Sequence, residues 1–338
     1  MNNQIWGNNE TEYFFNLNPE TILNSIDKLG FKTTGRTLAL NSMENRVYEL
    51  EVESKVSPSA NDFIVAKFYR PGRWSKEQIL EEHQFLKELI EDEIPVIAPI
   101  EIDGQTLFEI ETHKLWFTIF PKKAGRIPDE LNDEKISILG RLLARIHNTG
   151  VRTQATHRLE INPTTFGRNN LELLLNNQNL PQKYHTPLSD IVNRLCDTID
   201  PWFDGILNHR IHGDCHRSNL IHREDEGLFF VDFDDMLVGP AVQDVWLLVP
   251  GDDKFALEDR EKLLANYEIM RDFDYSTLRL IEPLRALRYT HFAAWMAKRW
   301  DDPSFTTAFP YFGSDEYWSS LIGDLYHQLE KIQGISCF

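Results

Sequence analysis

Two stretches in the first third of the chain have the apolar patterns of β-strands. In VYELEVES, residues 47–54, apolar residues alternate with glutamates, the period-two pattern of a strand with one solvent-facing side. In DFIVAKFYRPG, residues 62–72, the apolar run is nearly continuous, as in a strand covered on both sides, and Pro71-Gly72 ends it. Residues 106–110 and 115–120 are further strand candidates.

Three other segments carry apolar residues at helical spacing. Asn18-Pro19 opens a short helix that Gly30 ends, and Ser75 with Gln78 resembles a capping box that opens a helix through Ile90. A third helix is predicted over residues 135–150. The predicted buried faces are Ile79, Leu86, Leu89 and Ile90 in the second helix, and Ile136, Leu139, Leu143 and Ile146 in the third.

Strands therefore dominate the beginning of the chain and helices dominate the rest. This order predicts an α+β protein with two lobes. We expect a small antiparallel-sheet lobe over residues 1–120, a hinge at residues 121–125, and a larger, mainly helical lobe over residues 126–338.

The composition predicts the cellular compartment and argues against membrane insertion. No run of about 18 apolar residues occurs, and the amino terminus lacks the basic and apolar blocks of a secretory signal, so we expect a cytoplasmic protein that does not enter membranes. Three widely spaced cysteines, Cys196, Cys215 and Cys337, fit free thiols in a reducing compartment.

The net charge of −18 argues against non-specific nucleic-acid binding, which requires lysine and arginine to neutralise phosphates. A neutral or cationic partner is easier to accommodate. Alternatively, the excess carboxylates only keep the surface soluble. We expect a monomer.

The segment RIHGDCHRSNLIHREDEGLFFVDFDDMLVGP, residues 210–240, carries the candidate chemistry. Apolar runs at 220–222 and 228–231 flank a polar turn, which predicts a hairpin. The outer ends of an antiparallel hairpin are neighbours, so the amide of Asn219 and the carboxylate of Asp232 should converge. Few, hard oxygen ligands suit Mg²⁺, which takes the rest of its shell from water and substrate phosphates.

Asp214 lies on the loop that leads into the same hairpin end. There it can receive the proton of an attacking hydroxyl and orient that hydroxyl toward a γ-phosphate. Two alternatives stay open. These residues can be ordinary turn formers, or a transition metal can bind to the set His212, Cys215, His216 and His222, whose spacing matches no common zinc pattern.

Lys67 is a cation inside the apolar run FIVAKFY, and such a charge requires a partner. Kinases use a lysine of this kind to hold ATP phosphates, oriented by a helix glutamate. Glu82 falls on the apolar stripe of its helix and Glu81 does not, so Glu82 is the predicted partner. The alternative is that Lys67 extends its amine into solvent from an edge strand.

Two further features allow more than one interpretation. Asp244, in AVQDVW, can orient the catalytic loop, although a helix N-terminal acid is the commoner explanation. The helix 281–300 presents a stripe that suits either substrate recognition or packing with a solvated edge. The stripe consists of Arg285, Arg288, Tyr289, Trp295 and Arg299.

The motif H-G-D-x-H-x-x-N at His212–Asn219, followed by V-D-F-D-D at Val231–Asp235, resembles the signature of the aminoglycoside phosphotransferase and choline kinase superfamily. The resemblance implies a protein-kinase-like fold and ATP-dependent phosphoryl transfer. It implies Asp214 as the catalytic proton acceptor, Asn219 and Asp232 as magnesium ligands, with Asp232 also catalytic, and Ser42 in the nucleotide-covering loop. No G-x-G-x-x-G precedes Lys67, so the turn at residues 41–46 would cover the phosphates.

Over nearly the whole chain the sequence also resembles bacterial serine/threonine protein kinases of this fold that act in stress responses. Phosphorylation of protein serine and threonine hydroxyls is therefore the leading hypothesis. A small-molecule kinase for an aminoglycoside or amino alcohol is the alternative. A nucleotide-binding pseudokinase or scaffold is the non-enzymatic hypothesis, which the set Lys67, Asp214, Asn219 and Asp232 disfavours.

Overall fold

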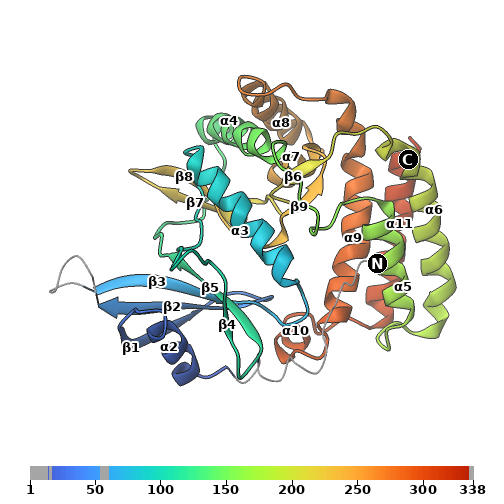
Figure 1. Ribbon diagram of the computed structural model, residues 1–338. Coiled ribbons are helices and arrows are strands. Elements are labelled where there is room, and N and C mark those ends of the chain that lie inside the picture. The colour runs from blue at the N-terminus through green and yellow to red at the C-terminus, as the bar shows by residue number, and fades with distance from the viewer. Residues whose placement is uncertain (1–13, 15–16, 54–60, 335–338) are drawn as a thin grey trace. The chain divides into compact units, whose positions relative to one another are not determined.

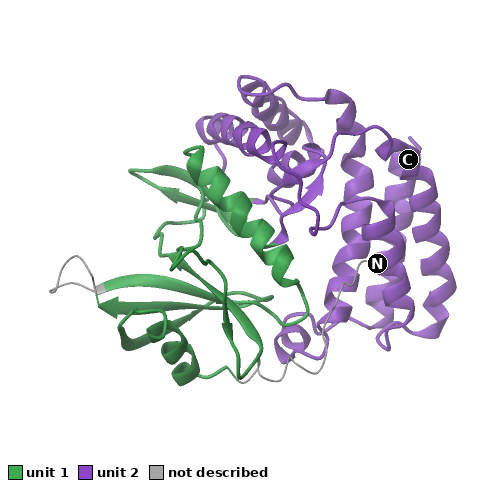
Figure 2. Cartoon of the chain, in the orientation of Figure 1, with its two compact units in different colours: residues 1–130, 217–234 green, residues 131–216, 235–338 purple. Residues whose placement is uncertain are grey.

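The computed structural model describes residues 14, 17–53 and 61–334 (Figure 1). Cys337 and the predicted strand end at Ser54 lie outside these ranges. The chain divides into two compact units, which Figure 2 colours separately. Unit 1 comprises residues 1–130 and 217–234, and unit 2 comprises residues 131–216 and 235–338.

Unit 1 contains a five-stranded antiparallel sheet in the order β1-β2-β3-β5-β4. Its elements are α2 (Pro19–Asp27), β1 (Thr33–Leu40), β2 (Arg46–Glu53), β3 (Asn61–Phe68), α3 (Lys76–Glu91), β4 (Phe108–Ile110), β5 (Leu115–Pro121), the 3₁₀ turn η3 (Arg217–Asn219), β7 (Leu220–Arg223) and β8 (Gly227–Phe230). A second 3₁₀ turn, η4 (Phe233–Asp235), begins at the end of this unit.

The core of unit 1 fixes β3 in the middle of the sheet. Phe68 is fully buried and stacks on Phe117 of the neighbouring β5, with 5.3 Å between ring centroids. Burial of one such side chain contributes about 1.5–3 kcal/mol relative to leaving it exposed. Because β2 and β5 flank β3, the position of Lys67 is determined on both sides.

Unit 2 is mainly helical. Its elements are α4 (Asp133–Gly150), the π-helical turn η1 (Pro163–Arg168), α5 (Asn169–Leu175), η2 (Gln182–Tyr184), α6 (His185–Phe203), β6 (His209–Ile211), β9 (Leu237–Gly239), α7 (Val242–Leu248), α8 (Lys254–Tyr267), η5 (Tyr275–Leu280), α9 (Ile281–Lys298), α10 (Pro303–Ala308) and α11 (Asp315–Ile332). The short β6–β9 ladder brackets the chain segment that contains Asp214.

The predicted α+β fold class is confirmed, and most predicted elements are present. The predicted faces of α3 and α4 are buried, with one error: Ile90 is 46 % exposed, since it lies at the end of α3 beyond the last turn that faces the sheet. Strand β1 was not predicted because most of its side chains are exposed or half-buried and show no regular alternation.

The division into units differs from the predicted lobe bounds at the β7–β8 hairpin. We expected residues 126–338 to form one lobe, but residues 126–130 and 217–234 group with unit 1. Backbone bridges explain this difference, because β8 pairs at Phe230 with Val96, and β7 pairs at His222 with Arg126. A hinge role for residues 121–125 stays a prediction. No helix of the described residues is both long and apolar enough to cross a membrane.

Candidate active site

Lys67 lies at the centre of a buried cluster of charges in unit 1. Its side chain is 8 % exposed, and its Nζ is 2.7 Å from Asp234 Oδ1, 3.7 Å from Glu82 Oε1 and 3.8 Å from Asp232 Oδ1. The alternative that Lys67 extends into solvent from an edge strand is therefore wrong, since β3 is an inner strand and the amine is buried.

The carboxylates keep this amine charged. Burial alone would lower the pKa of Lys67, but the negative charges of Asp234, Glu82 and Asp232 outweigh it and raise that pKa above its ordinary value. Unit 1 thus holds a permanent, preorganised cation, which is what binding of phosphate oxygens requires.

Helix α3 aims Glu82 at Lys67. Ser75 and Gln78 form the predicted capping box, which fixes where the helix begins. From that start, Glu82 falls on the buried face and is 1 % exposed, whereas Glu81 is half-buried. The predicted ion pair between Glu82 and Lys67 is therefore present, and its use in holding ATP phosphates stays a prediction.

Asp234 is a site residue that the sequence analysis missed. It is 2 % exposed, and besides Lys67 it accepts hydrogen bonds from Arg73 Nη1 and, at 3.3 Å, from Asn45 Nδ2. The sequence offered no signal for it, because Asp232 is equally next to Phe233 and yet has a side chain that is 58 % exposed. Only the structure shows that Asp234 is the buried acid, and a buried acid requires a cation.

The loop that contains Ser42 is tied to the same cluster through Asn45. Ser42 Oγ accepts a hydrogen bond from Asn45 N at 3.3 Å, and Asn45 Oδ1 accepts one from Arg70 N at 3.2 Å. Asn45 thereby connects the loop to Asp234 and to the chain just beyond β3. A nucleotide-covering role for Ser42 stays a prediction.

The predicted hairpin is present as β7–β8, and its open end brings two candidate metal ligands together along the backbone. Asn219 O accepts a hydrogen bond from Val231 N at 3.0 Å. Asp232 therefore lies beside the end of β7 that Asn219 precedes. Asp232 has a left-handed backbone (φ 60°), and its side chain is 58 % exposed. Non-glycine residues seldom adopt this conformation, and the surrounding structure has to hold Asp232 in it.

In unit 2, Asp214 is held by an arginine and a histidine. Arg288 Nη2 of α9 donates to Asp214 Oδ1 at 2.8 Å, and His216 Nε2 lies 3.1 Å from Asp214 Oδ2. Burial would raise the pKa of Asp214, but the hydrogen bond from His216 and the charge of Arg288 hold that pKa well below its ordinary value. Asp214 is therefore an ionised carboxylate with a fixed orientation.

The loop before Asp214 is braced by Asp244 of α7. The fully buried Asp244 carboxylate accepts hydrogen bonds from His212 N and Gly213 N, each at 2.9 Å. His147 Nε2 lies 3.1 Å from the same carboxylate, and the Tyr267 hydroxyl lies 2.9 Å from His147 Nδ1. Asp244 thus orients the loop before Asp214, and the commoner explanation, a helix N-terminal acid, does not account for these contacts.

Gly213 has a conformational reason to be glycine. Its φ of 84° lies in the left-handed region, and an added Cβ would approach the Asp235 carbonyl oxygen to 2.3 Å. Two of the transition-metal candidates are close to this loop. His212 and Cys215 are fully buried, and burial raises the pKa of the Cys215 thiol, which disfavours the thiolate that a metal requires.

Residues 37–281 match the Phosphotransferase enzyme family, which is more than half of the chain. The chain belongs to this family. The resemblance noted for His212–Asn219 and Val231–Asp235 is thereby confirmed, and the chain is a phosphotransferase of a family that uses ATP.

Curated relatives of this phosphotransferase cover nearly its whole length. Stress response kinase A of Escherichia coli (strain K12) is 35 % identical over 327 residues, which span 96 % of this chain and 97 % of the relative. The protein named serine/threonine protein kinase RdoA of Salmonella typhimurium is 36 % identical over 306 residues, 90 % of each chain.

Solved structures of other kinases share the fold. An amicoumacin kinase, hAmiN, in complex with AMP-PNP, Ca²⁺ and Ami has a TM-score of 0.71 at 18 % identity and covers 94 % of this chain and 95 % of its own. A microcompartment-associated aminopropanol kinase has a TM-score of 0.67 at 18 % identity, with coverage of 92 % and 98 %. At this identity the likeness concerns the protein-kinase-like fold, which the sequence analysis predicted.

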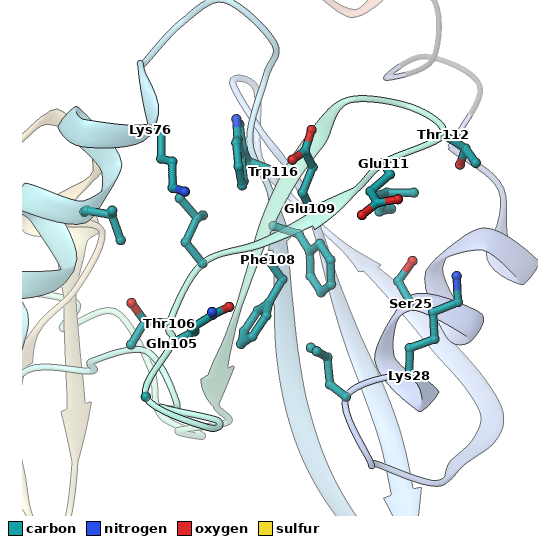
Figure 3. A pocket seen from close by; sticks show the side chains of 16 residues that line it. Ser25, Lys28, Lys76, Gln105, Thr106, Phe108, Glu109, Glu111, Thr112 and Trp116 are labelled. Carbon is teal, nitrogen blue, oxygen red and sulfur yellow. The ribbon is translucent and has the colours of Figure 1, made fainter.

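Unit 1 of this phosphotransferase also contains a pocket away from Lys67. Figure 3 shows it around Phe108, with Lys76 of α3 on one side and Lys28 of α2 on the other. Its cavity volume is about 770 Å³. Neither Lys67 nor any of its three carboxylate partners lines this pocket, so it is separate from the candidate active site.

Proposed function

We propose that this phosphotransferase is a Mg²⁺-dependent serine/threonine protein kinase, which transfers the γ-phosphoryl group of ATP to protein hydroxyls. The observation that carries the phosphoryl transfer is the buried Lys67, charged and oriented by Glu82 and Asp234. The protein substrate is supported by the relative named serine/threonine protein kinase, and a stress role by the relatives named stress response kinase A. We also propose that the protein acts in the cytoplasm.

The residues of unit 1 supply the nucleotide half of the reaction. Lys67 offers its ammonium group to the phosphates, while Glu82 and Asp234 keep that group in place. The loop with Ser42, tied down by Asn45, covers the phosphates. Such positioning and charge neutralisation account for most of the catalysis in phosphoryl transfer.

Asn219 and Asp232 fit a magnesium ion by chemistry and exposure. Both are oxygen donors, Asn219 O accepts a hydrogen bond from the amide of Val231, the residue before Asp232, and more than half of the Asp232 side chain is accessible. Magnesium, when bound, would neutralise phosphate charge. Asn219 and Asp232 are the residues that would hold it, and the other ligands would be water and phosphate oxygens.

Asp214 is the group that orients the acceptor hydroxyl and takes its proton. Asp214 is fixed by Arg288 and His216, and Asp244 braces its loop. Asp214 and Asn219 are five residues apart in the chain, so covalent geometry limits their separation to roughly 18 Å. An acceptor at Asp214 and phosphates near Asn219 are compatible with that limit.

A small-molecule kinase is the second candidate, because the solved structures that share this fold include an amicoumacin kinase and an aminopropanol kinase. A pseudokinase or scaffold is the third. Incubation of the purified chain with labelled ATP, Mg²⁺ and a cell lysate separates the three. The proposal expects label in protein bands. Label in small metabolites alone favours the second candidate, and no ATP turnover favours the third.

The Asp214→Ala variant tests the catalytic assignment in the same assay. We expect ATP binding close to that of the wild type and transfer reduced by roughly 100-fold or more, the usual contribution of a positioned general base. Asp225→Ala is a matched control, because Asp225 is an exposed acid at the turn of the β7–β8 hairpin. Normal transfer by Asp214→Ala would show that Asp214 is not the proton acceptor.

A further inference from the structure

The carboxylate of Asp214 is already neutralised by the protein itself. Arg288 donates to one of its oxygens and His216 lies beside the other. The side chains of Asp214, His216 and Arg288 are 22 %, 36 % and 38 % exposed, so all three are accessible to an acceptor. Each carboxylate oxygen has two lone pairs, so Asp214 can still accept a hydrogen bond from an acceptor hydroxyl.

The group formed by Asp214, His216 and Arg288 is therefore neutral or positive, whereas the whole chain is strongly negative. Arg288 cancels the charge of Asp214, and protonation of His216 makes the group of three positive. The hydrogen bond to Asp214 raises the pKa of His216, which favours that protonated form. The net charge of −18 suggests a cationic partner, but the carboxylate of Asp214 is already compensated by Arg288 and so attracts a cationic molecule only weakly.

Arg288 differs in this respect from Arg285, which lies one turn earlier on α9. Arg285 Nε is 3.3 Å from Glu282 Oε2, its Nη2 donates to Pro250 O, and its guanidinium lies over the Trp246 ring. Arg285 is thus balanced by an acid of its own helix. Arg288 is instead balanced by Asp214, and its contact to Asp214 uses one of its five N–H groups.

We infer that Arg288 determines the charge of the acceptor: it disfavours a hydroxyl that has a cationic group close by and favours one in neutral or acidic surroundings. Two like charges a few ångströms apart repel each other strongly in a partly desolvated site. A guanidinium N–H is also a good donor to a carboxylate of the acceptor.

This inference rests on the proposed function and narrows it. A serine or threonine with acidic neighbours meets the charge requirement. An amino alcohol does not, because its ammonium group is separated from the reacting hydroxyl by only a few bonds. The residue that positions the catalytic carboxylate would thereby also select against the substrates of small-molecule kinases.

Matched peptides test the inference. Two serine peptides differ only in the flanking residues, aspartate in one and lysine in the other, and kcat/KM is measured for both at the same ionic strength. We expect the wild type to prefer the acidic peptide by on the order of tenfold. Arg288→Gln should bring the ratio close to one, Arg288→Lys should keep a preference, and Arg285→Gln should retain the wild-type ratio.

The ratio separates charge selection from a structural role, since loss of Asp214 orientation lowers transfer to both peptides alike. If Arg288→Gln has no measurable turnover, the same ratio is obtained from binding of peptides with alanine in place of serine. An unchanged ratio in Arg288→Gln, or a wild-type preference for lysine, would overturn the inference.

A second pair of acceptors keeps the inference distinct from the proposed function. A cationic amino alcohol is compared with its neutral N-acetyl form. If the wild type labels no peptide or protein but still prefers the neutral form, the protein-kinase proposal fails and the role of Arg288 stands. If it labels peptides without regard to their charge, only the role of Arg288 fails.

Discussion

Asp234 is a single side chain that determines the arrangement of charges around Lys67. Two buried cations of unit 1 converge on it, since Lys67 and Arg73 both contact its carboxylate. The sequence led to Glu82 as the partner of Lys67, because helical periodicity tells which glutamate faces inward. It did not lead to Asp234, because V-D-F-D-D contains three aspartates and no periodicity distinguishes them.

Asp234→Asn should destabilise the protein and weaken ATP binding. Removing the charge leaves two buried cations without their main partner, and breaking a buried pair in this way costs about 3–5 kcal/mol of unfolding free energy. Chemical denaturation measures this loss. Glu101→Gln is the control, because its pair with Lys87 is about half exposed and worth about 1 kcal/mol or less. A loss in Asp234→Asn no larger than in the control would contradict the assignment.

The pair of His216 and Asp214 should make stability depend on pH in a defined direction. The pKa of His216 is raised in the folded protein, so its contribution is fully present below 6.5, the ordinary histidine pKa, and is lost as the pH rises through the folded value. The difference in unfolding free energy between wild type and His216→Gln should therefore shrink above that pH. A difference that grows with pH would exclude this ion pair.

At the scale of elements, one strand and one helix place Lys67 and Glu82 on rigid supports. Strand β3 holds Lys67 because inner strands are fixed on both sides, and α3 holds Glu82 because its capping box sets where the helix begins. Strong periodicity made both elements predictable. Strand β1 was missed because its largely exposed side chains give no such pattern, and it forms through its backbone pairing with β2.

Helix α7 should prove essential to the catalytic loop through Asp244. Asp244→Ala leaves the amides of His212 and Gly213 buried without their acceptor, at a cost of roughly 1–3 kcal/mol for each unsatisfied group. We expect a lower melting temperature and a kcat that falls more than ATP affinity does. Asp253→Ala, which removes the exposed cap of α8, should cost only about 1 kcal/mol and leave kcat unchanged. Equal effects of the two variants would reduce Asp244 to a helix N-terminal acid.

At the scale of the whole molecule, the candidate site residues are divided between the two units. Unit 1 contains the charged Lys67 and the hairpin end with Asn219 and Asp232, and unit 2 contains Asp214. The β7–β8 hairpin follows the Asp214 loop in sequence yet groups with unit 1, so the chain passes between the units within each of the two motifs, after His216 and after Asp234.

Removal of the divalent cation should abolish most of the stabilisation by nucleotide. A ligand at 100 times its dissociation constant stabilises the folded state by about 2.7 kcal/mol. We expect ATP with Mg²⁺ to raise the melting temperature, and a chelator to remove most of that rise. In Asn219→Ala combined with Asp232→Ala, ATP should give the same small rise with or without the cation. An undiminished Mg²⁺ effect in the double variant would place the metal elsewhere.

The sequence by itself determined the fold class, the elements of strong periodicity, the pairing of Glu82 with Lys67 and the neighbourhood of Asn219 and Asp232. Those features depend on local geometry, which is encoded in short stretches of chain. Only the tertiary structure decided the partners that lie far apart in sequence: Arg288 at Asp214, Asp244 at the loop, and Asp234 between Arg73 and Lys67. The physical reason is that a buried charge requires a partner without specifying which one, and that choice is made by packing.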